Sequence, residues 1–290
     1  MNIVMVNGQF VERNEAKVDI EDRGYQFGDG IYEVIRVYNG KMFAASEHLE
    51  RLVECAGKIK LTLPFSNTDI QTMLQTLIEK NALTTGIVYL QSSRGVAVRN
   101  HAFPTTDTVA SFIAYTKELP RPLHNITNGV KAALVEDERW LKCDIKSLNL
   151  LGNILAKQEA AELGCFEAIL HRGETVTEGS SSNISIVKDG VVYTHQADKY
   201  ILNGITRQQM LALCGVHSIA FEEKSFTVEE LLNADEVFMT STTAEVTPII
   251  EIAGRKIGTG APGSISIKLQ QLLASEIARQ CGRIYLEIDR

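Results

Sequence analysis

The sequence has few cysteines, and their spacing suggests neither a disulfide framework nor a metal site. Five cysteines stand alone at positions 55, 143, 165, 214 and 281 of the 290-residue chain, without a CxxC pair. We therefore expect no metal, reduced thiols and a cytoplasmic location. Cys143 lies close to Lys146, and we interpret it as a small core residue rather than a reactive thiol.

Long apolar runs and an excess of positive charge are also missing. No run approaches the roughly 20 apolar residues of a membrane-spanning helix, and the first residues, MNIVMVNGQFVERNE, lack the basic and apolar segments of a secretory signal. The formal net charge of −7 argues against nucleic acid as a main partner, because phosphate contacts need clustered Lys and Arg. With 44% hydrophobic and 22% charged residues, the composition predicts a soluble globular protein.

Proline is scarce, and two of the six prolines mark the predicted domain boundary. Pro120 and Pro122 lie in the polar stretch KELPRPLHN, where neither a helix nor a strand continues easily. We therefore expect an N-terminal domain over 1–119 and a C-terminal domain over 120–290. Both halves mix helix and strand patterns without a steady alternation, which favours an α+β fold.

Local patterns predict several individual elements. Asn39–Gly40 and Asp189–Gly190 each separate two apolar runs, which is the signal of a hairpin. Ser46 is the expected cap of one helix, and Thr68 with Gln71 forms the expected capping box of the next. The patterns predict helices over 46–59, from Thr68, over 148–163 and over 264–281, and strands at IVYLQSSRG and VASFIAYTK.

Lys146 carries the most suggestive chemical group of the sequence. It lies in RWLKCDIKSLNLLGN, next to Ile145 and just before a run that contains several leucines. A lysine stem on the surface, with its ammonium in water, is the plain interpretation. A buried lysine amine can instead condense with an aldehyde, because burial lowers its pKa. The residues around Lys146 leave both interpretations open.

Three stretches carry polar groups that suit an anion. TEGSSSN places Glu178 before a glycine and three serines, and LNGITRQQM places Thr206 at the opening of a predicted helix whose free N–H groups suit a phosphate. In FMTSTTAEVTP a strand ends in three consecutive hydroxyls. An ordinary turn, plain N-capping and a polar loop remain the alternatives, and none of the stretches contains a P-loop or a GxGxxG fingerprint.

The stretch RGVAVRNHAFP holds a candidate carboxylate site. Arg99 and His101 are two residues apart, so in an extended segment both side chains point to one side. The arginine fork and one histidine N–H would together hold a carboxylate, with a solvated loop as the alternative. A lysine amine, phosphate-binding loops and one acid together describe a site for pyridoxal phosphate, whose aldehyde, phosphate and pyridine nitrogen need these partners.

The chain resembles the fold-type IV pyridoxal phosphate enzymes, and among them most closely the bacterial D-amino acid aminotransferases. The resemblance runs from near Met5 to near Arg255 and is carried by DRGYQFGDGIYEV, EHLERL, CDIKSLNLLGN, EAILHR…TVTEGSSSN, GITR and TSTTAEVTP. It implies a two-domain α+β fold with pyridoxal phosphate bound between the domains, and a homodimer.

The resemblance also implies a role for each residue that matches a motif. Lys146 would hold the cofactor covalently and move the Cα proton of the substrate, with Tyr32 beside that bond, and Glu178 would pair with the protonated pyridine nitrogen. The phosphate would be bound by Arg51, by backbone at Ile205 and Thr206, and by the hydroxyls of Thr206 and Thr242. The substrate α-carboxylate would be bound by Tyr32, Tyr89, Arg99 and His101, the last two from the neighbouring subunit.

These implications predict a transaminase that moves an amino group from D-alanine or a similar D-amino acid to a 2-oxo acid such as 2-oxoglutarate, giving pyruvate or the corresponding 2-oxo acid and D-glutamate. Because the Cα–H bond must face Lys146, chirality depends on which side takes the carboxylate. The alternatives are an L-branched-chain aminotransferase, an aminodeoxychorismate lyase and a non-catalytic pyridoxal phosphate carrier. The Arg99–His101 pair argues against the first two, and the set of Lys146, Glu178 and Tyr32 against the third.

Overall fold

The chain forms two compact units. The computed structural model describes residues 2–105 and 107–284. Unit 1 takes the chain up to Pro120 together with Ile145–Asn149 and Gln280–Arg283, and unit 2 takes Arg121–Asp144 and Leu150–Arg279. The segment that carries Lys146 therefore groups with unit 1, although the residues on both sides of it belong to unit 2. The division into domains over 1–119 and 120–290 stays a prediction.

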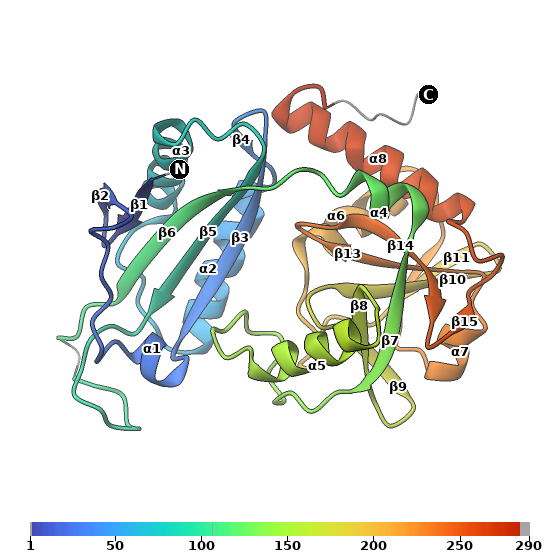
Figure 1. Cartoon of the computed structure of the whole chain (residues 1–290), viewed down its shortest axis with the longest axis horizontal. Helices are drawn as coiled ribbons and strands as arrows, with labels where there is room; N and C mark the ends of the chain where they lie inside the picture. The colour runs from blue at the N-terminus through green and yellow to red at the C-terminus, as the bar shows by residue number, and fades with distance from the viewer. Residues whose placement is uncertain (1, 106, 285–290) are drawn as a thin grey trace. The chain divides into compact units, whose positions relative to one another are not determined.

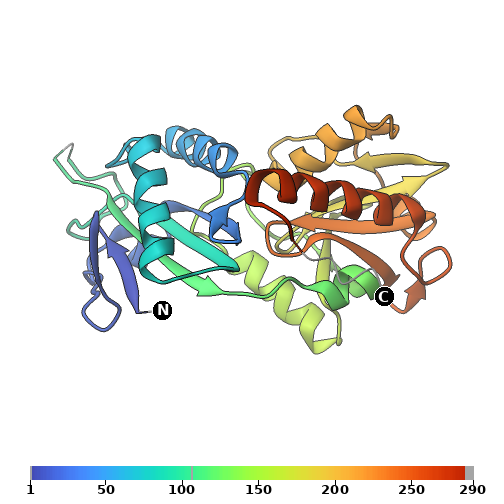
Figure 2. The ribbon, with the colours of Figure 1, turned by 90° about the horizontal axis from the view of Figure 1, so that it is seen from above.

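Unit 1 is built on a six-stranded antiparallel sheet with the strand order β2-β1-β6-β5-β3-β4, and the helices α2 and α3 cover one of its faces (Figures 1 and 2). The strands are β1 (Ile3–Val6), β2 (Gln9–Glu12), β3 (Gly30–Tyr38), β4 (Lys41–Met42), β5 (Gly86–Ser93) and β6 (Ser111–Glu118), and the helices are α1 (Arg23–Phe27), α2 (Ala45–Lys58) and α3 (Asn67–Lys80). The two strands expected at IVYLQSSRG and VASFIAYTK are thereby confirmed as β5 and β6.

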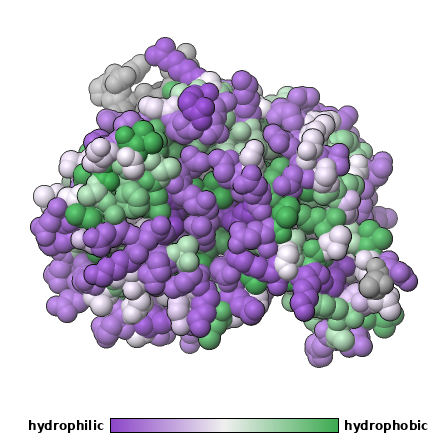
Figure 3. Space-filling model, turned by 180° about the vertical axis from the view of Figure 1, so that it is seen from behind, coloured by the Kyte–Doolittle hydropathy of each residue, from purple (hydrophilic) through white to green (hydrophobic). Residues whose placement is uncertain are grey.

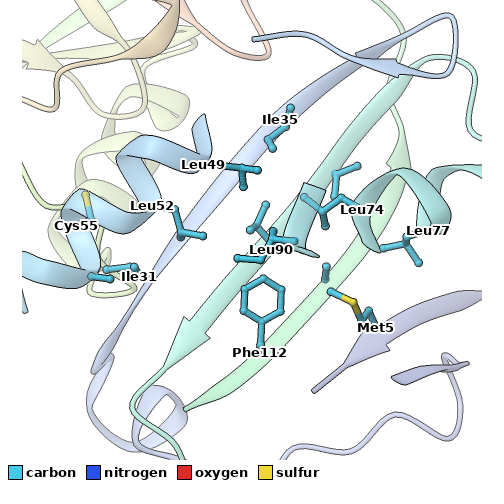
Figure 4. Close-up of a cluster of buried hydrophobic side chains, with 14 of the residues drawn as sticks. Met5, Ile31, Ile35, Leu49, Leu52, Cys55, Leu74, Leu77, Leu90 and Phe112 are labelled. Carbon is cyan, nitrogen blue, oxygen red and sulfur yellow. The ribbon is translucent and has the colours of Figure 1, made fainter. Parts of the chain in front are cut away.

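The core of unit 1 lies between this sheet and the two helices. Figure 4 shows Ile35 of β3 and Leu90 of β5 among side chains of α2 and α3, such as Leu49 and Leu74, all buried in one cluster. Each such side chain stabilises the fold by about 1.5–3 kcal/mol when it is fully buried. Because strand side chains alternate, the opposite face of the sheet carries the half-buried side chains between them, including Tyr32.

The starts of α2 and α3 differ from the prediction. The residue before α2 is Ala44, which has a positive φ of 52° and provides no side-chain cap, so the expected capping by Ser46 is wrong. The N-cap of α3 is Ser66, whose Oγ accepts a hydrogen bond from the Asp69 N–H at 3.2 Å. The helix therefore begins before Thr68, and the expected capping box is wrong.

Unit 2 is built on a nine-stranded mixed sheet with the order β12-β11-β10-β13-β14-β7-β8-β9, in which β15 also pairs with β14. The strands are β7 (Val130–Glu136), β8 (Glu167–Arg172), β9 (Thr175–Gly179), β10 (Asn183–Lys188), β11 (Val191–Thr194), β12 (Phe221–Glu223), β13 (Glu236–Ser241), β14 (Glu245–Ile252) and β15 (Arg255–Lys256). The helices are α4 (Leu123–Asn128), α5 (Leu151–Glu162), α6 (Ile205–Val216), α7 (Val228–Leu232) and α8 (Ser264–Cys281).

Both predicted hairpins and the last helix are confirmed. Asn39–Gly40 joins β3 to β4 and Asp189–Gly190 joins β10 to β11, and all four residues have the positive φ that these tight turns need. The helix α8 covers the predicted range, and its first turn is held by Glu236, which accepts hydrogen bonds from two backbone N–H groups there.

The helix α5 departs from its prediction at its start. It begins at Leu151, three residues later than expected, and ends before Gly164, which has a positive φ of 71°. Its buried residues are Ala156 and Ala160, which pack on β7 and β8. The large apolar side chains of the helix are exposed in the single chain: Leu151, Ile154 and Leu155.

The surface mixes hydrophilic side chains with hydrophobic patches in both units (Figure 3). Within residues 2–105 and 107–284, no helix combines the length and the hydropathy that crossing a membrane requires. All five cysteines are free thiols.

Candidate active site

In unit 1, Lys146 is positioned by the backbone of β3. The Tyr32 N–H donates to the Lys146 carbonyl at 3.0 Å, and the Leu148 N–H donates to the Gly30 carbonyl at 2.9 Å, so this segment runs beside the start of β3. The Lys146 Nζ lies 4.2 Å from the centroid of the Tyr32 ring. Lys146 is half-buried, and within the described chain its amine forms no salt bridge. The amine is thus directed against an aromatic ring and is free to react without breaking an ion pair.

Tyr32 and Tyr89 lie next to each other on the same face of the sheet. Their ring centroids are 5.8 Å apart with an interplanar angle of 24°, and Tyr89 stacks in turn on Tyr115 at 5.0 Å. Burial raises the pKa of Tyr89 well above its usual range, and the two neighbouring tyrosines add to this. Its neutral hydroxyl donates to Gln91 Oε1 at 2.8 Å. The structure therefore brings Lys146, Tyr32 and Tyr89 together, as the resemblance implies.

Arg51 on α2 is held by a buried carboxylate that the sequence analysis missed. Its Nε and Nη2 donate to the two oxygens of Glu33 at 2.7 and 2.8 Å, and His48 Nδ1 lies 2.7 Å from Glu33 Oε2. Burial raises the pKa of Glu33, but Arg51 and His48 outweigh burial and lower it to about 2. The signal was present in the sequence, because Glu33 falls between Ile31 and Ile35 on the core side of a strand.

Arg99 and His101 lie in the exposed loop between β5 and β6. The Arg99 guanidinium carbon is 4.5 Å from the centroid of the Phe27 ring, and the His101 ring centroid is 5.7 Å from the same ring. The structure therefore brings this pair together on one aromatic side chain, although the segment is bent rather than a regular strand. Both side chains are exposed in the single chain and are accessible to an incoming anion.

In unit 2, Glu178 is buried at the end of β9 with one acceptor position to spare. Its Oε1 accepts from Arg139 Nη1 at 2.6 Å, and its Oε2 accepts from Asn183 Nδ2 and the Leu202 N–H, both at 3.0 Å. An ionised carboxylate has about four acceptor positions, so these donors leave one on Oε1 for a further N–H. Burial raises the pKa of Glu178 to about 7, although Arg139 opposes this shift.

Arg139 is shared between two carboxylates, and the sequence analysis missed it. Its Nε and Nη2 donate to Asp137 at 2.9 and 3.0 Å, while Nη1 serves Glu178. Arg172 Nε also donates to Asp137, at 3.1 Å. The neighbouring Cys143 is buried, and burial raises the pKa of its thiol to about 11, which agrees with the interpretation as a core residue.

Asn183 joins the three polar stretches that the sequence singles out in unit 2. Its Nδ2 donates both to Glu178 and to the Leu202 carbonyl, and across β10 and β13 it pairs with Thr240, two residues before Thr242. A Cβ at Gly204 would lie 2.2 Å from Asn183 Oδ1, so only glycine fits there. The three stretches give only weak signals individually, but they are joined through Asn183 in the folded chain.

In unit 2, the residues predicted to bind the phosphate lie at the start of α6 and in the turn between β13 and β14. The helix α6 begins at Ile205, one residue before Thr206, where the sequence places its opening, and its N-cap residue Gly204 provides no side-chain acceptor for the first N–H groups. Those N–H groups and the helix dipole favour an anion. Thr206 is buried in the first turn of α6, and Thr242 is half-buried in the turn between β13 and β14.

The three serines of TEGSSSN form a tight, donor-rich loop whose hydroxyls bind a side chain of the protein. The hydroxyls of Ser180, Ser181 and Ser182 all donate to the fully buried carboxylate of Glu167. The three hydroxyl protons are therefore used in hydrogen bonds to Glu167. The arrangement fixes the turn that follows Glu178.

The sequence model of the family "Amino-transferase class IV" matches residues 30–252. The chain belongs to the class IV aminotransferases. The D-alanine aminotransferase of Staphylococcus aureus (strain MSSA476) is 52% identical over 271 residues, which cover 93% of this chain and 96% of that protein. The D-alanine aminotransferase of Listeria monocytogenes serotype 4b (strain F2365) is 50% identical over 283 residues, covering 97% and 98%.

The fold agrees with this membership. The branched-chain amino acid aminotransferase of T.th., solved with pyridoxamine 5'-phosphate, superposes with a TM-score of 0.88 and 26% identity over 98% of this chain and 95% of that chain. The α+β class and the fold-type IV architecture expected from the sequence are thereby confirmed.

The side chains of this aminotransferase fit pyridoxal phosphate, the cofactor of the class. Lys146 has an amine without an ionic partner, Glu178 has an unused acceptor position, and the start of α6 has uncapped N–H groups. These three features match the aldehyde, the pyridine nitrogen and the phosphate in turn.

Proposed function

We propose that the protein is a pyridoxal phosphate-dependent D-amino acid transaminase. It transfers the amino group of D-alanine or a similar D-amino acid to a 2-oxo acid such as 2-oxoglutarate, which gives pyruvate and D-glutamate. The observation that carries this proposal is the identity of about half of all residues with D-alanine aminotransferases along nearly the whole of both chains.

Lys146 provides the reactive amine. Pyridoxal phosphate, when bound, withdraws electrons from the substrate Cα so that the Cα–H proton can leave. We assign to Lys146 Nζ the covalent bond to the cofactor and, once the substrate amine has displaced it, the transfer of the Cα proton. The ring of Tyr32, 4.2 Å from Nζ, limits the directions from which the amine approaches.

Glu178 holds the proton on the pyridine nitrogen. Its spare acceptor position on Oε1 suits one N–H donor, and a cationic ring draws electrons from Cα better than a neutral one. The phosphate would be held by Arg51, by the backbone of Ile205 and Thr206, and by the hydroxyls of Thr206 and Thr242.

Arg99 and His101 would bind the substrate α-carboxylate, with Tyr32 and Tyr89 as further partners. Because both side chains lie on an exposed loop, they are accessible to the active site of a second copy of the chain. Confining the carboxylate to one side leaves the other side for the substrate side chain, so that only the D enantiomer directs its Cα–H bond at Lys146.

A homodimer is supported by the exposed apolar side of α5. Leu151, Ile154 and Leu155 are between 59% and 64% exposed in the single chain and fall on one side of the helix. We assign this surface to a second copy. Sedimentation of the wild type and of Leu155→Glu tests this assignment, since a dimer that the substitution leaves unweakened would rule out this surface as the contact.

The five free thiols support the predicted cytoplasmic location.

The transamination is tested with purified protein, pyridoxal phosphate and 2-oxoglutarate, supplied with D-alanine or with L-alanine. We expect pyruvate from the D enantiomer, and no turnover in Lys146→Ala, which removes the amine but leaves the phosphate contacts. Turnover of L-branched-chain amino acids in place of D-alanine would contradict the proposal, and so would cofactor binding without transamination of either enantiomer.

A further inference from the structure

Asp29 is the common partner of two buried arginines in unit 1. Arg23 Nε donates to Asp29 Oδ2 at 2.8 Å, while Arg94 Nε and Nη2 donate to Oδ2 and Oδ1 at 2.8 and 2.9 Å. Both arginines are buried, with 3% and 7% of their surface exposed. The two guanidinium groups lower the pKa of Asp29 although burial opposes them. The carboxylate is therefore ionised and ties the end of β5 to the segment after α1.

Arg23 extends from this cluster to the loop that carries the carboxylate-binding pair. Its Nη1 donates to the Asn100 carbonyl at 2.6 Å, and Asn100 is the residue between Arg99 and His101. Its guanidinium also lies 4.8 Å from the centroid of the Phe27 ring, which Arg99 and His101 contact as well. The backbone between the pair is thus anchored while both side chains rest on one ring.

Arg94 fixes the base and the far side of the same loop. Its Nη1 and Nη2 donate to the carbonyls of Lys60 and Ile59 at 3.0 and 2.8 Å, and its guanidinium lies 3.7 Å from the centroid of the Phe103 ring. The Arg94 N–H donates to the Asp29 carbonyl at 3.0 Å. The exposed segment from 99 to 102 is therefore held at both ends by side chains that Asp29 orients.

We propose that Asp29 and Arg23 are positioning residues for substrate recognition: they hold the segment of Arg99 and His101 in the geometry in which both side chains meet one carboxylate. This inference rests on the proposed function, in which Arg99 and His101 bind the substrate α-carboxylate. Binding groups on loops need such support, because an unsupported exposed segment spreads over many conformations and weakens each contact.

The test compares Arg23→Met, Asp29→Asn and Arg99→Ala by steady-state kinetics on the cofactor-loaded protein. Arg23→Met keeps an apolar stem on Phe27 and leaves the Asp29–Arg94 fork intact, so it removes the loop anchor with little risk to folding. We expect the KM for D-alanine and the KM for 2-oxoglutarate to rise together by about tenfold or more, because both substrates carry the carboxylate. Cofactor content and the visible absorbance of the bound cofactor stay unchanged.

Two further measurements separate positioning from a general loss of structure. Amide hydrogen exchange of residues 94–103 becomes faster in Arg23→Met, and Arg23→Lys, which keeps the charge, restores part of the affinity. In the double variant Arg23→Met/Arg99→Ala, the KM rises by less than the two single increases combined, since the anchor acts partly through Arg99 and only its effect on His101 remains. The control is Glu236→Gln, which weakens the capping of α8 in unit 2 and leaves both KM values unchanged.

The outcomes distinguish this inference from the proposed function. If Arg99→Ala raises both KM values and the Arg23 and Asp29 variants do not, the loop binds the carboxylate without this anchor and the inference is wrong. If Arg99→Ala leaves both KM values unchanged, the carboxylate is bound elsewhere, and both proposals for this loop fail. A KM increase in Arg23→Met that adds fully to that of Arg99→Ala also overturns the inference.

Discussion

Each unit contains a buried glutamate paired with an arginine, yet the two carboxylates differ in charge behaviour. Glu33 of unit 1 receives both fork bonds of Arg51 and a contact from His48, and its pKa is about 2. Glu178 of unit 2 receives one N–H of Arg139, whose other donors serve Asp137, and its pKa is about 7. Burial raises the pKa of both, so the difference comes from their neighbours: Arg51 and His48 both lower the pKa of Glu33, whereas Glu178 shares Arg139 with Asp137, whose negative charge raises it further.

Glu33 and Glu178 differ in whether their carboxylates are available for chemistry. Glu33 is neutralised by an arginine of its own and fixes the direction of Arg51. Glu178 receives only one N–H of Arg139, and the negative charge of Asp137 lies nearby. Glu178 therefore gains more from a further cation. A protonated pyridine nitrogen would provide that cation, which supports the proposed role of Glu178.

The largest expected effect on stability comes from Glu33→Gln. The substitution leaves the buried Arg51 charge without its partner, and breaking a buried pair in this way costs about 3–5 kcal/mol in the free energy of unfolding. Urea unfolding of the cofactor-free protein measures the loss. Glu33→Gln with wild-type stability would show that Arg51 finds another acceptor and that the two clusters do not differ as described.

Glu178→Gln should show the reverse pattern, with a large loss of activity and little loss of stability. A neutral partner lets the pyridine nitrogen lose its proton, so turnover of D-alanine falls by about 100-fold or more, equivalent to about 3 kcal/mol of transition-state stabilisation. Arg139 keeps its fork on Asp137, so the fold stays intact. Wild-type turnover at normal cofactor content would remove Glu178 from the catalytic assignment.

The two glutamates affect the pH dependence of stability in opposite directions, because the pKa of Glu178 is raised and that of Glu33 is lowered. Glu178 has a raised pKa, so its contribution to stability is present below its ordinary value of 4.5 and is lost as pH rises through about 7. At about 1.4 kcal/mol per pKa unit, a rise from 4.5 to about 7 limits this loss to at most about 3.5 kcal/mol. Glu33 has a lowered pKa, so its contribution is present above 4.5 and is lost as pH falls through about 2.

The measurement is the free energy of unfolding of cofactor-free wild type and Glu178→Gln between about pH 5 and pH 8. We expect the wild type to lose stability relative to the variant across this range. Bound pyridoxal phosphate should flatten the difference, because the pyridine N–H stabilises the ionised carboxylate. Parallel curves without cofactor would mean that the pKa of Glu178 is not raised in the folded protein.

The smallest expected effect concerns Arg172, which supports the shared cluster from its more exposed side. Arg172→Gln removes one charge-assisted bond to Asp137, and because the side chain is 25% exposed the loss is about 1 kcal/mol or less. Activity should change little, since Arg139 still contacts both carboxylates. A loss of turnover as large as that of Glu178→Gln would show that the cluster acts as one unit.

Local sequence patterns determined much of the fold and several candidate residues. Asn39–Gly40 and Asp189–Gly190 specify their hairpins because tight turns need residues that accept positive φ. The apolar spacing before Cys281 specifies α8, and a glycine followed by Ile205 specifies the start of α6. Lys146 and Glu178 were singled out as candidates in their own stretches, but each left a plain alternative open, and their predicted roles come from the resemblance.

Only the tertiary structure decided which groups meet. Glu33 and Arg51 are 18 residues apart and Glu178 and the Leu202 N–H are 24 apart, and in neither pair do the two residues share a helix or strand, so no helix or strand period relates them. The exposed apolar side of α5 likewise depends on what packs against the helix, because amphipathic spacing does not say whether a stripe faces the core or another chain. Sequence periodicity reports local geometry, whereas the sharing of Arg139 depends on the distances between strands far apart in the chain.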